Sequence, residues 1–277
     1  MLITLITAGL RHFRCGGCSG GTGRRCGFFL RFFGKISCGA RRREGGFDAF
    51  DTVLTIHVVA KSRADAEKIS ENIHALAMDL HRLFDIYHTY DDIMNLKTVN
   101  DRAGDGTAVH VSKDIINLLL LGQDMYDISG GKVNVCMGAV LSIWHTYRTE
   151  GTAIPSANEL TAAATHTVPS VLVVDETTST ICLNAPDASL DVGAIAKGSG
   201  DDQRYYTVDG TRYHHLIDPN TLMPATYHRS VTIIASLAHT ETADGLSTAA
   251  FLMSLKDGDS MLAKFESIDG IWIEEGK

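Results

Sequence analysis

The chain of 277 residues is long enough for one large domain or two small ones, and its 44% hydrophobic and 21% charged residues are typical of globular proteins. Its net charge of -8 is unevenly distributed, because residues 1–46 carry nine Lys or Arg and one acid, while residues 47–277 carry 16 bases and 32 acids. An acidic body argues against nucleic-acid binding through a broad basic surface.

Residues 1–46 differ in composition from the rest of the chain. They contain four of the six cysteines and eleven of the 26 glycines. Their apolar start, MLITLITAGL, is too short for a transmembrane helix and lacks the basic residues that open a signal peptide. The CGGC at 15–18 has no second pair at a suitable spacing, so a zinc knuckle is the weaker alternative. We predict a disordered or aberrant segment at 1–46 and a domain at 47–277.

Beyond that segment the residue patterns are regular. Residues 50–60, FDTVLTIHVVA, are rich in β-branched side chains and predict a strand. Residues 62–85 show helical apolar spacing behind a Ser cap and predict a long amphipathic helix. A polar loop with two tyrosines at 86–106 leads to a short strand at 108–112. Residues 113–131 predict a second helix that ends at a pair of glycines.

The second half of the chain alternates hairpins and helices. The predicted elements are a helix at 156–166, a hairpin at 169–185, a hairpin at 205–215 with Asp209 and Gly210 in its turn, a strand at 230–238, helices at 241–253 and 260–267, and a strand at 268–274. Helices mixed with antiparallel hairpins predict a single α+β domain. Cys136 and Cys182 lie in apolar, strand-like contexts, which favours free, buried thiols over a disulfide.

The stretch ETADGLSTAAFLM at 241–253 carries a candidate metal pair. Asp244 and Thr248 are four residues apart, so on a helix they share one face and can offer a carboxylate and a hydroxyl to one cation. Oxygen ligands favour Mg²⁺ or Ca²⁺ over zinc. An isolated D-x-x-x-T is more often a capping residue on an ordinary polar face. Two motifs upstream, DVGAIAKG at 191–198 and YHHLIDP at 213–219, favour the metal site here.

Together these motifs resemble the FAD:protein FMN transferases, the ApbE-like flavin transferases of the thiamine-biosynthesis lipoprotein family. The resemblance covers most of the chain from about residue 47 and keeps one order of motifs. The matching stretches are FDTVLTI (50–56), YDDIMNLKTVND (90–101), SGGKVNVCMGAVLSIWH (129–145), DVGAIAKG (191–198), YYTVDGTRYHHLIDPNT (205–221) and SVTIIA through TADGLSTAAFLM (230–253). The resemblance implies a single ApbE-like domain that binds FAD and Mg²⁺.

The resemblance also implies roles for particular residues. It places Tyr87 on the flavin ring, where an aromatic side chain can stack while its hydroxyl stays wet; an ordinary surface tyrosine is an equal alternative. It gives the metal the carbonyl oxygen of Ala194 beside Asp244 and Thr248. The residues that it assigns to the flavin nucleotide are Lys132, Val133, Asn134, Asp191 and Lys197.

His215 matches the position of a general base in this family. A histidine can take a proton from a hydroxyl near neutral pH. The alternative for His214 and His215 is a strand whose imidazoles only pack or face water.

The chain departs from the family at three places. Many relatives carry an acid where Asn134 stands. Relatives read DPxTGxP, and the bulky Leu222 in place of that glycine should resist positive φ, so we expect another loop shape. After Gly198 the chain passes straight into Ser199, as if an internal block of several tens of residues had been removed. The expected domain is therefore incomplete.

The function that the resemblance implies is Mg²⁺-dependent transfer of the FMN half of FAD to a Thr or Ser hydroxyl of an acceptor protein, with release of AMP. Two alternatives stay open: an FAD pyrophosphatase that uses water, and a non-catalytic remnant with at most weak flavin binding. The missing block leads us to expect poor transfer. The family also implies the extracytoplasmic face of the membrane or the periplasm, although no export signal is recognisable here.

Overall fold

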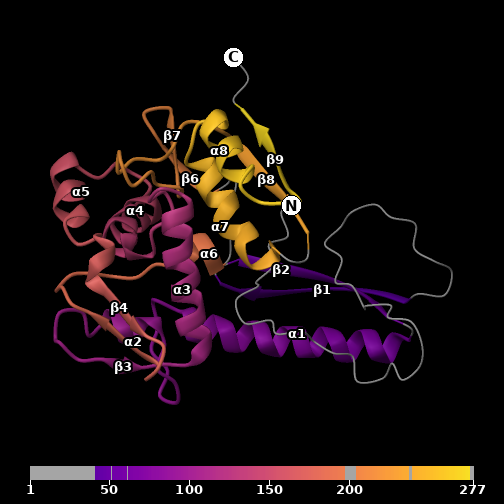
Figure 1. Cartoon of the computed structure of the whole chain (residues 1–277). Coiled ribbons are helices and arrows are strands. Elements are labelled where there is room, and N and C mark those ends of the chain that lie inside the picture. Colours follow the sequence, from indigo (N-terminus) through magenta and orange to yellow (C-terminus); the bar gives the residue numbers. More distant parts are fainter. Residues whose placement is uncertain (1–40, 51, 61, 197–203, 237–238, 275–277) are drawn as a thin grey trace.

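A computed structural model describes residues 41–50, 52–60, 62–196, 204–236 and 239–274 of the chain (Figure 1). The strands in this part are β1 (Arg41–Ala49), β2 (Thr52–Ala60), β3 (Val109–His110), β4 (Leu172–Asp175), β5 (Thr180–Leu183), β6 (Tyr205–Val208), β7 (Thr211–His214), β8 (Ser230–Ala235) and β9 (Ile268–Ile273). The α-helices are α1 (Arg63–Phe84), α2 (Leu96–Asn100), α3 (Lys113–Ile128), α4 (Gly138–Glu150), α5 (Ala157–Ala164), α6 (Gly193–Ala196), α7 (Thr240–Phe251) and α8 (Leu255–Leu262). Two 3-10 turns, η1 (Val135–Met137) and η2 (Pro169–Val171), complete the elements.

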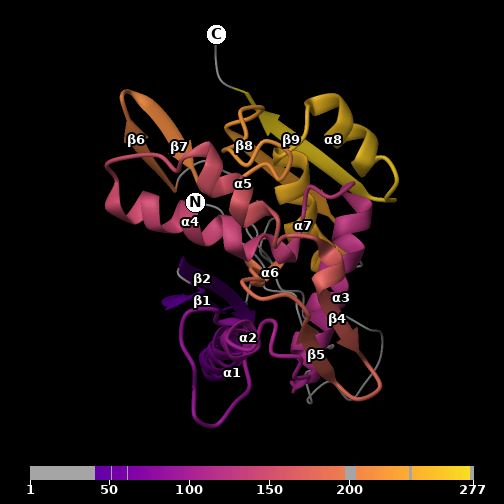
Figure 2. The same cartoon turned by 90° about the vertical axis from the view of Figure 1, so that its left-hand side faces the viewer.

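The strands form small antiparallel sheets with helices between them. Their orders are β1-β2, β3-β5-β4, β6-β7 and β8-β9. Figures 1 and 2 show α3 and α7 in the middle of the molecule, with α1 under the first hairpin and the β8-β9 pair on the opposite side. The predicted α+β class with antiparallel pairing is confirmed.

The N-terminal hairpin contains the predicted strand and one strand that the sequence did not predict. The strand expected at 50–60 is confirmed as β2, and Phe50, with φ of 55°, turns the chain so that β1 pairs back on it. The unpredicted strand is β1, which begins at Arg41, and the domain boundary expected near Gly46 stays a prediction. The CGGC stretch and the rest of residues 1–40 lie outside the described residues.

Helix α1 has the predicted extent and covers this hairpin. The Ser62 side chain accepts a hydrogen bond from the Asp65 N–H at 3.1 Å, which satisfies one of the free donors of the first turn. Its apolar stripe buries Ala77, Leu80 and Phe84. The stripe is core, as the periodicity predicts.

Helices α3 and α7 cross closely in the centre. Helix α3 begins at the Ser112 cap and buries most of its apolar residues, and α7 meets it through Gly245. A Cβ at Gly245 would lie 2.9 Å from the Met125 Cγ, so a larger residue would require the buried Met125 side chain to shift. This contact fixes where α7 lies against α3, and therefore also where the candidate metal pair lies.

The loop after α1 contains helix α2, which the sequence did not predict. Asn95 is fully buried and bonds in three directions, accepting from the Thr98 N–H and donating to the carbonyls of Arg82 and His88. These bonds satisfy a buried amide and hold the loop against the end of α1. The loop is therefore an ordered support for Tyr87.

A second core cluster joins α4 and α5 to the β6-β7 hairpin. The buried Trp144 donates from Nε1 to the Leu222 carbonyl at 2.9 Å, and its ring lies 6.0 Å from that of Tyr213. Leu222 has φ of 60°, which corrects the expectation that its bulk would prevent this conformation. Its backbone N–H bonds to the Asp218 carbonyl at 2.8 Å, and its side chain packs in the cluster. These contacts offset the strain of a left-handed leucine.

The other predicted elements are met with small shifts. Helix α5, the β4-β5 hairpin, the β6-β7 hairpin, β8 and β9 stand where the patterns predict. Helix α8 begins at Leu255, five residues before the predicted start. The residues directly before the DVGAIAKG motif form no strand. The helix within the motif, α6, has four residues in the described part of the chain. Cys136 lies in η1 rather than a strand, and both described cysteines are free, Cys136 buried and Cys182 half-buried.

Candidate functional site

Helices α6 and α7 bring two of the three predicted metal ligands into contact. The Thr248 hydroxyl donates to the Ala194 carbonyl oxygen at 3.2 Å, although the two residues are 54 positions apart. Asp244 lies one helical turn before Thr248 on α7, so its carboxylate shares the face that meets α6. Two of the three predicted oxygens are thus in direct contact, and the third lies on the same helix face.

The Asp244 carboxylate is the polar group in this region that lacks a partner. Its Oδ2 atom is buried and has no hydrogen bond. Burial raises the pKa of Asp244 well above its ordinary value, because an isolated charge is costly away from water. A bound cation would remove that cost, so the donor set fits a hard divalent metal. Within the described ranges no three His, Cys, Asp or Glu side chains gather as a metal site, and this set has a single carboxylate.

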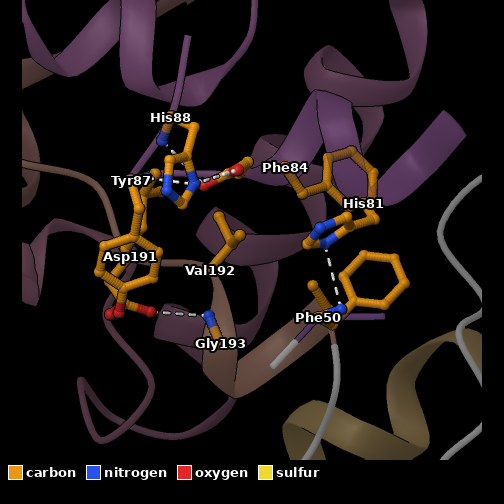
Figure 3. A pocket seen from close by; sticks show the side chains of 11 residues that line it. Phe50, His81, Phe84, Tyr87, His88, Asp191, Val192 and Gly193 are labelled. Atoms are coloured by element: carbon orange, nitrogen blue, oxygen red, sulfur yellow. Dashed lines mark hydrogen bonds and ion pairs between the residues drawn. The ribbon is translucent and has the colours of Figure 1, made fainter. Parts of the chain in front are cut away.

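A pocket opens beside the start of α6. It is open to solvent, has an empty volume of about 620 Å³, and is lined by residues from the β1-β2 turn, the end of α1 and the DVGAIAKG segment. Tyr87 and Asp191, both predicted flavin ligands, line it together, whereas His81 and Phe50 stand on the other side (Figure 3). The structure therefore brings together two predicted residues that are about a hundred positions apart.

Asp85 holds the wall that carries Tyr87. Its buried carboxylate accepts from the backbone N–H groups of Tyr87 and His88 at 2.7 and 3.2 Å, and from the Tyr90 hydroxyl at 2.9 Å. Burial alone would raise the pKa of Asp85, but these hydrogen bonds together outweigh it and lower the pKa. These hydrogen bonds hold the loop around an ionised carboxylate. In this loop conformation Tyr87 lines the pocket and is 45% exposed.

Asp191 is fixed by backbone contacts on both sides. Its N–H donates to the Val135 carbonyl at 2.8 Å, and its Oδ1 accepts from the Gly193 N–H at 2.8 Å. Asn100 clamps the preceding residue, because its amide exchanges two hydrogen bonds with the Leu190 backbone at 2.8 and 3.1 Å. The sequence did not identify Asn100, whose only signal is its place in the YDDIMNLKTVND stretch.

Lys132, Val133 and Asn134 have local partners in this structure. Lys132 Nζ lies 2.8 and 2.9 Å from the two carboxylate oxygens of Asp218. Val133 is buried, and the Asn134 side chain donates to the Thr167 carbonyl and accepts from the Cys136 N–H, both at 2.9 Å. Lys132 thus forms an ion pair with the HHLIDP loop, and its flavin contact stays a prediction. Lys197 lies outside the described residues.

The two neighbouring histidines differ in their surroundings. His214 is buried, its Nδ1 accepts from the Leu216 N–H at 3.2 Å, and its Nε2 lies 2.7 Å from the Ala225 carbonyl, so the neutral ring is held between two backbone groups. His215 follows the end of β7 and is half-buried. His214 therefore supports the loop, and His215 is the better placed of the two to exchange a proton.

Comparisons with known proteins identify relatives of this chain. A family model described as the ApbE family matches residues 50–198 and 199–272. An FAD:protein FMN transferase of Klebsiella pneumoniae (strain 342) is 23% identical over an alignment of 265 positions that covers 71% of this chain and 82% of the relative. An FAD:protein FMN transferase of Treponema pallidum (strain Nichols) is 23% identical over an alignment of 325 positions that covers 87% of this chain and 88% of the relative.

Solved structures show the same fold. The ApbE protein of Thermotoga maritima superposes with a TM-score of 0.72 at 23% identity, covering 84% of this chain and 94% of that one. The flavin transferase ApbE of Vibrio cholerae gives 0.69 at 17% identity, covering 86% and 94%. At these identities the structural likeness establishes the architecture.

Proposed function

The chain belongs to the ApbE family, and from that premise we propose that it is an FAD:protein FMN transferase that depends on Mg²⁺ and modifies a Thr or Ser hydroxyl of an acceptor protein. The observation that carries the proposal is the junction of α6 and α7. There a buried carboxylate oxygen of Asp244 without a partner shares a helix face with a hydroxyl that contacts the Ala194 carbonyl. Such a set of oxygens fits the metal that a pyrophosphate substrate brings with it.

In this proposal the residues of the chain divide the work of binding and proton transfer. Asp244, Thr248 and the Ala194 carbonyl would hold Mg²⁺, which when bound neutralises charge on the phosphate oxygens of FAD. Tyr87 offers its exposed ring to the flavin, and Asp191 fixes the backbone beside it.

His215 would accept the proton of the acceptor hydroxyl. As that proton leaves, the hydroxyl oxygen bonds to the FMN phosphorus and the phosphoanhydride bond to AMP breaks. The buried Lys132–Asp218 pair supports this step from outside, because it fixes the loop that follows His215.

Product analysis tests the proposal. The purified chain is incubated with FAD, Mg²⁺ and an acceptor domain that carries a Thr or Ser site, and mass spectrometry measures FMN on the acceptor and AMP in solution. An FMN adduct that depends on Mg²⁺ supports the transferase. Free FMN and AMP in equal amounts, without an adduct, would identify a pyrophosphatase instead. Asp244→Ala should lower either activity by orders of magnitude, because it removes the one charged ligand, whereas Thr248→Ala should be milder.

A second candidate, a flavin-binding chain with little transfer activity, is favoured by the junction of Gly198 and Ser199. The family match divides into two segments that meet there. The alignment with the Klebsiella relative is 265 positions long although it covers only 71% of the 277 residues, so several tens of its positions have no counterpart here. We therefore expect slow transfer, and rescue when the missing block of a relative is inserted between the two residues. Retained FAD without AMP release would support this candidate.

The family premise also leads us to propose an extracytoplasmic site of action. None of the helices in the described ranges is long and apolar enough to cross a membrane. Cell fractionation with an antibody to the chain tests the proposal, and a purely cytoplasmic signal would overturn it.

A further inference from the structure

Helix α4 contacts Tyr87 through the His145 ring and packs against strand β6 through Trp144, and these two elements carry two hydrogen-bond donors, Arg148 and Tyr206. Trp144 and Arg148 are one turn apart on α4, and the Trp144 side is buried against the β6-β7 hairpin. Tyr206 lies on the inward face of β6, with its ring 5.7 Å from that of Tyr213. Figure 2 shows the hairpin beside α4. Arg148 and Tyr206 have no place in the mechanism derived above.

The Tyr206 hydroxyl is buried and has no hydrogen-bond partner within the described part of the chain. The residue is 8% exposed, and burial is the main reason that its pKa is raised. A buried hydroxyl without a partner lowers stability, because it has lost water and gained nothing. A phenylalanine would fill the same space without this cost, so the hydroxyl indicates a group that binds to it.

Arg148 places a desolvated cation beside the same pocket. Its guanidinium donates to His145 Nδ1 at 3.2 Å, and the His145 ring lies 5.5 Å from the ring of Tyr87, which lines the pocket. Burial and the neighbouring Arg204 lower the pKa of Arg148, whereas Tyr87, Asp191 and Tyr206 raise it. Through His145, Arg148 is therefore linked to the Tyr87 wall of the pocket.

We infer that Arg148 and Tyr206 are positioning residues that donate hydrogen bonds to the carbonyl edge of a flat heteroaromatic ring lying against Tyr87, which in an FMN transferase is the pyrimidine edge of the flavin. The inference rests on the proposed function. The ring edge is favoured over a phosphate for two reasons. The donors stand with the aromatic wall of Tyr87 and His145, and the neighbouring Asp191 carboxylate repels a phosphate dianion. In this assignment the phosphates of FAD bind near the proposed metal ligands at the junction of α6 and α7.

Removal of the single hydroxyl gives a sharp test, because stability and binding should move in opposite directions. Tyr206→Phe removes an unpartnered buried group, so the Tm of the flavin-free chain should rise by a few degrees. Binding of riboflavin, followed by quenching of its fluorescence, should weaken about tenfold, which is about 1.4 kcal/mol. Riboflavin is the probe because it carries the ring and lacks phosphate. ADP, which carries the phosphates without the flavin ring, should bind equally to variant and parent.

A second variant and two controls complete the test. Arg148→Gln should also weaken riboflavin binding and leave ADP binding unchanged. Tyr205→Phe is the matched control, because Tyr205 is the next residue of β6, points to the opposite face and is exposed. Arg102→Gln controls for loss of a positive charge from an exposed loop. Neither control should change the affinity for riboflavin.

The outcomes separate this inference from the proposed function. Equal riboflavin affinity in Tyr206→Phe and parent, or no binding by the parent, would overturn the inference. Weaker ADP binding in Arg148→Gln would assign Arg148 to a phosphate and also overturn it. If Tyr206→Phe weakens riboflavin binding but the parent chain forms no FMN adduct, the inference stands and the proposed transferase activity is refuted.

Discussion

The ion pair between Lys132 and Asp218 gives the sharpest test of whether a residue of the KVN stretch supports the fold or binds flavin. Both carboxylate oxygens lie within 2.9 Å of Nζ, and the side chains are only 16% and 6% exposed. Lys132→Met leaves Asp218 buried and without its counter-charge. Breaking such a pair costs about 3–5 kcal/mol, and the remaining Asn220 N–H bond places this case near the lower value.

The expected cost converts to a measurable shift in melting temperature. For a chain of this size about 1 kcal/mol shifts the Tm by 2–4 °C, so Lys132→Met should melt about 6–12 °C lower without flavin. The matched control is Lys97→Met, since Lys97 pairs with Asp101 at a more exposed position and should cost less than about 1 kcal/mol. In Lys132→Met/Asp218→Leu much of the stability should return, because no buried charge is left.

Thermal unfolding by circular dichroism and riboflavin binding by fluorescence distinguish the two roles of Lys132. A lower Tm with little change in affinity in the folded variant supports the structural role. A Tm within about 2 °C of the parent, together with much weaker riboflavin binding, would refute it and assign Lys132 to the flavin, as the family resemblance implies.

His215→Asn should slow FMN transfer by about 10²–10⁴-fold with little change in Tm. His214→Asn should lower the Tm, because the His214 ring is held between two backbone groups. A larger loss of transfer rate in His214→Asn than in His215→Asn would reverse the assignment of the general base. Burial lowers the pKa of His228 below its ordinary 6.5, so the unfolded chain takes up this proton first as the pH falls. The free energy of unfolding should therefore decline below about pH 6.5 and level off below the folded-state pKa, and His228→Gln should flatten this part of the curve; an unchanged slope in pH-dependent denaturation would contradict the reasoning. Deletion of residues 1–40 should leave the Tm unchanged, and deletion of residues 1–49 should lower it, because the second also removes the strand that pairs with β2; equal melting of both would contradict the boundary at Arg41.

Local patterns predicted most of the helices and hairpins of this chain. Ser62 and Ser112 start their helices with the side-chain hydrogen bonds that a cap makes, and Asp209-Gly210 forms the hairpin turn with positive φ at both residues. The four-residue spacing of Asp244 and Thr248 likewise placed both on one face of a helix. Such features depend on neighbours within a few positions, which the sequence displays directly.

The tertiary structure decided which distant groups meet. It set the Thr248 hydroxyl on the Ala194 carbonyl, paired Lys132 with Asp218, and held His214 between two backbone groups. It also held Leu222 at positive φ, against its intrinsic preference, through bonds to Asp218 and Trp144. Each of these results depends on the total free energy of contacts between elements that are far apart in the chain. A local sequence pattern does not contain that information.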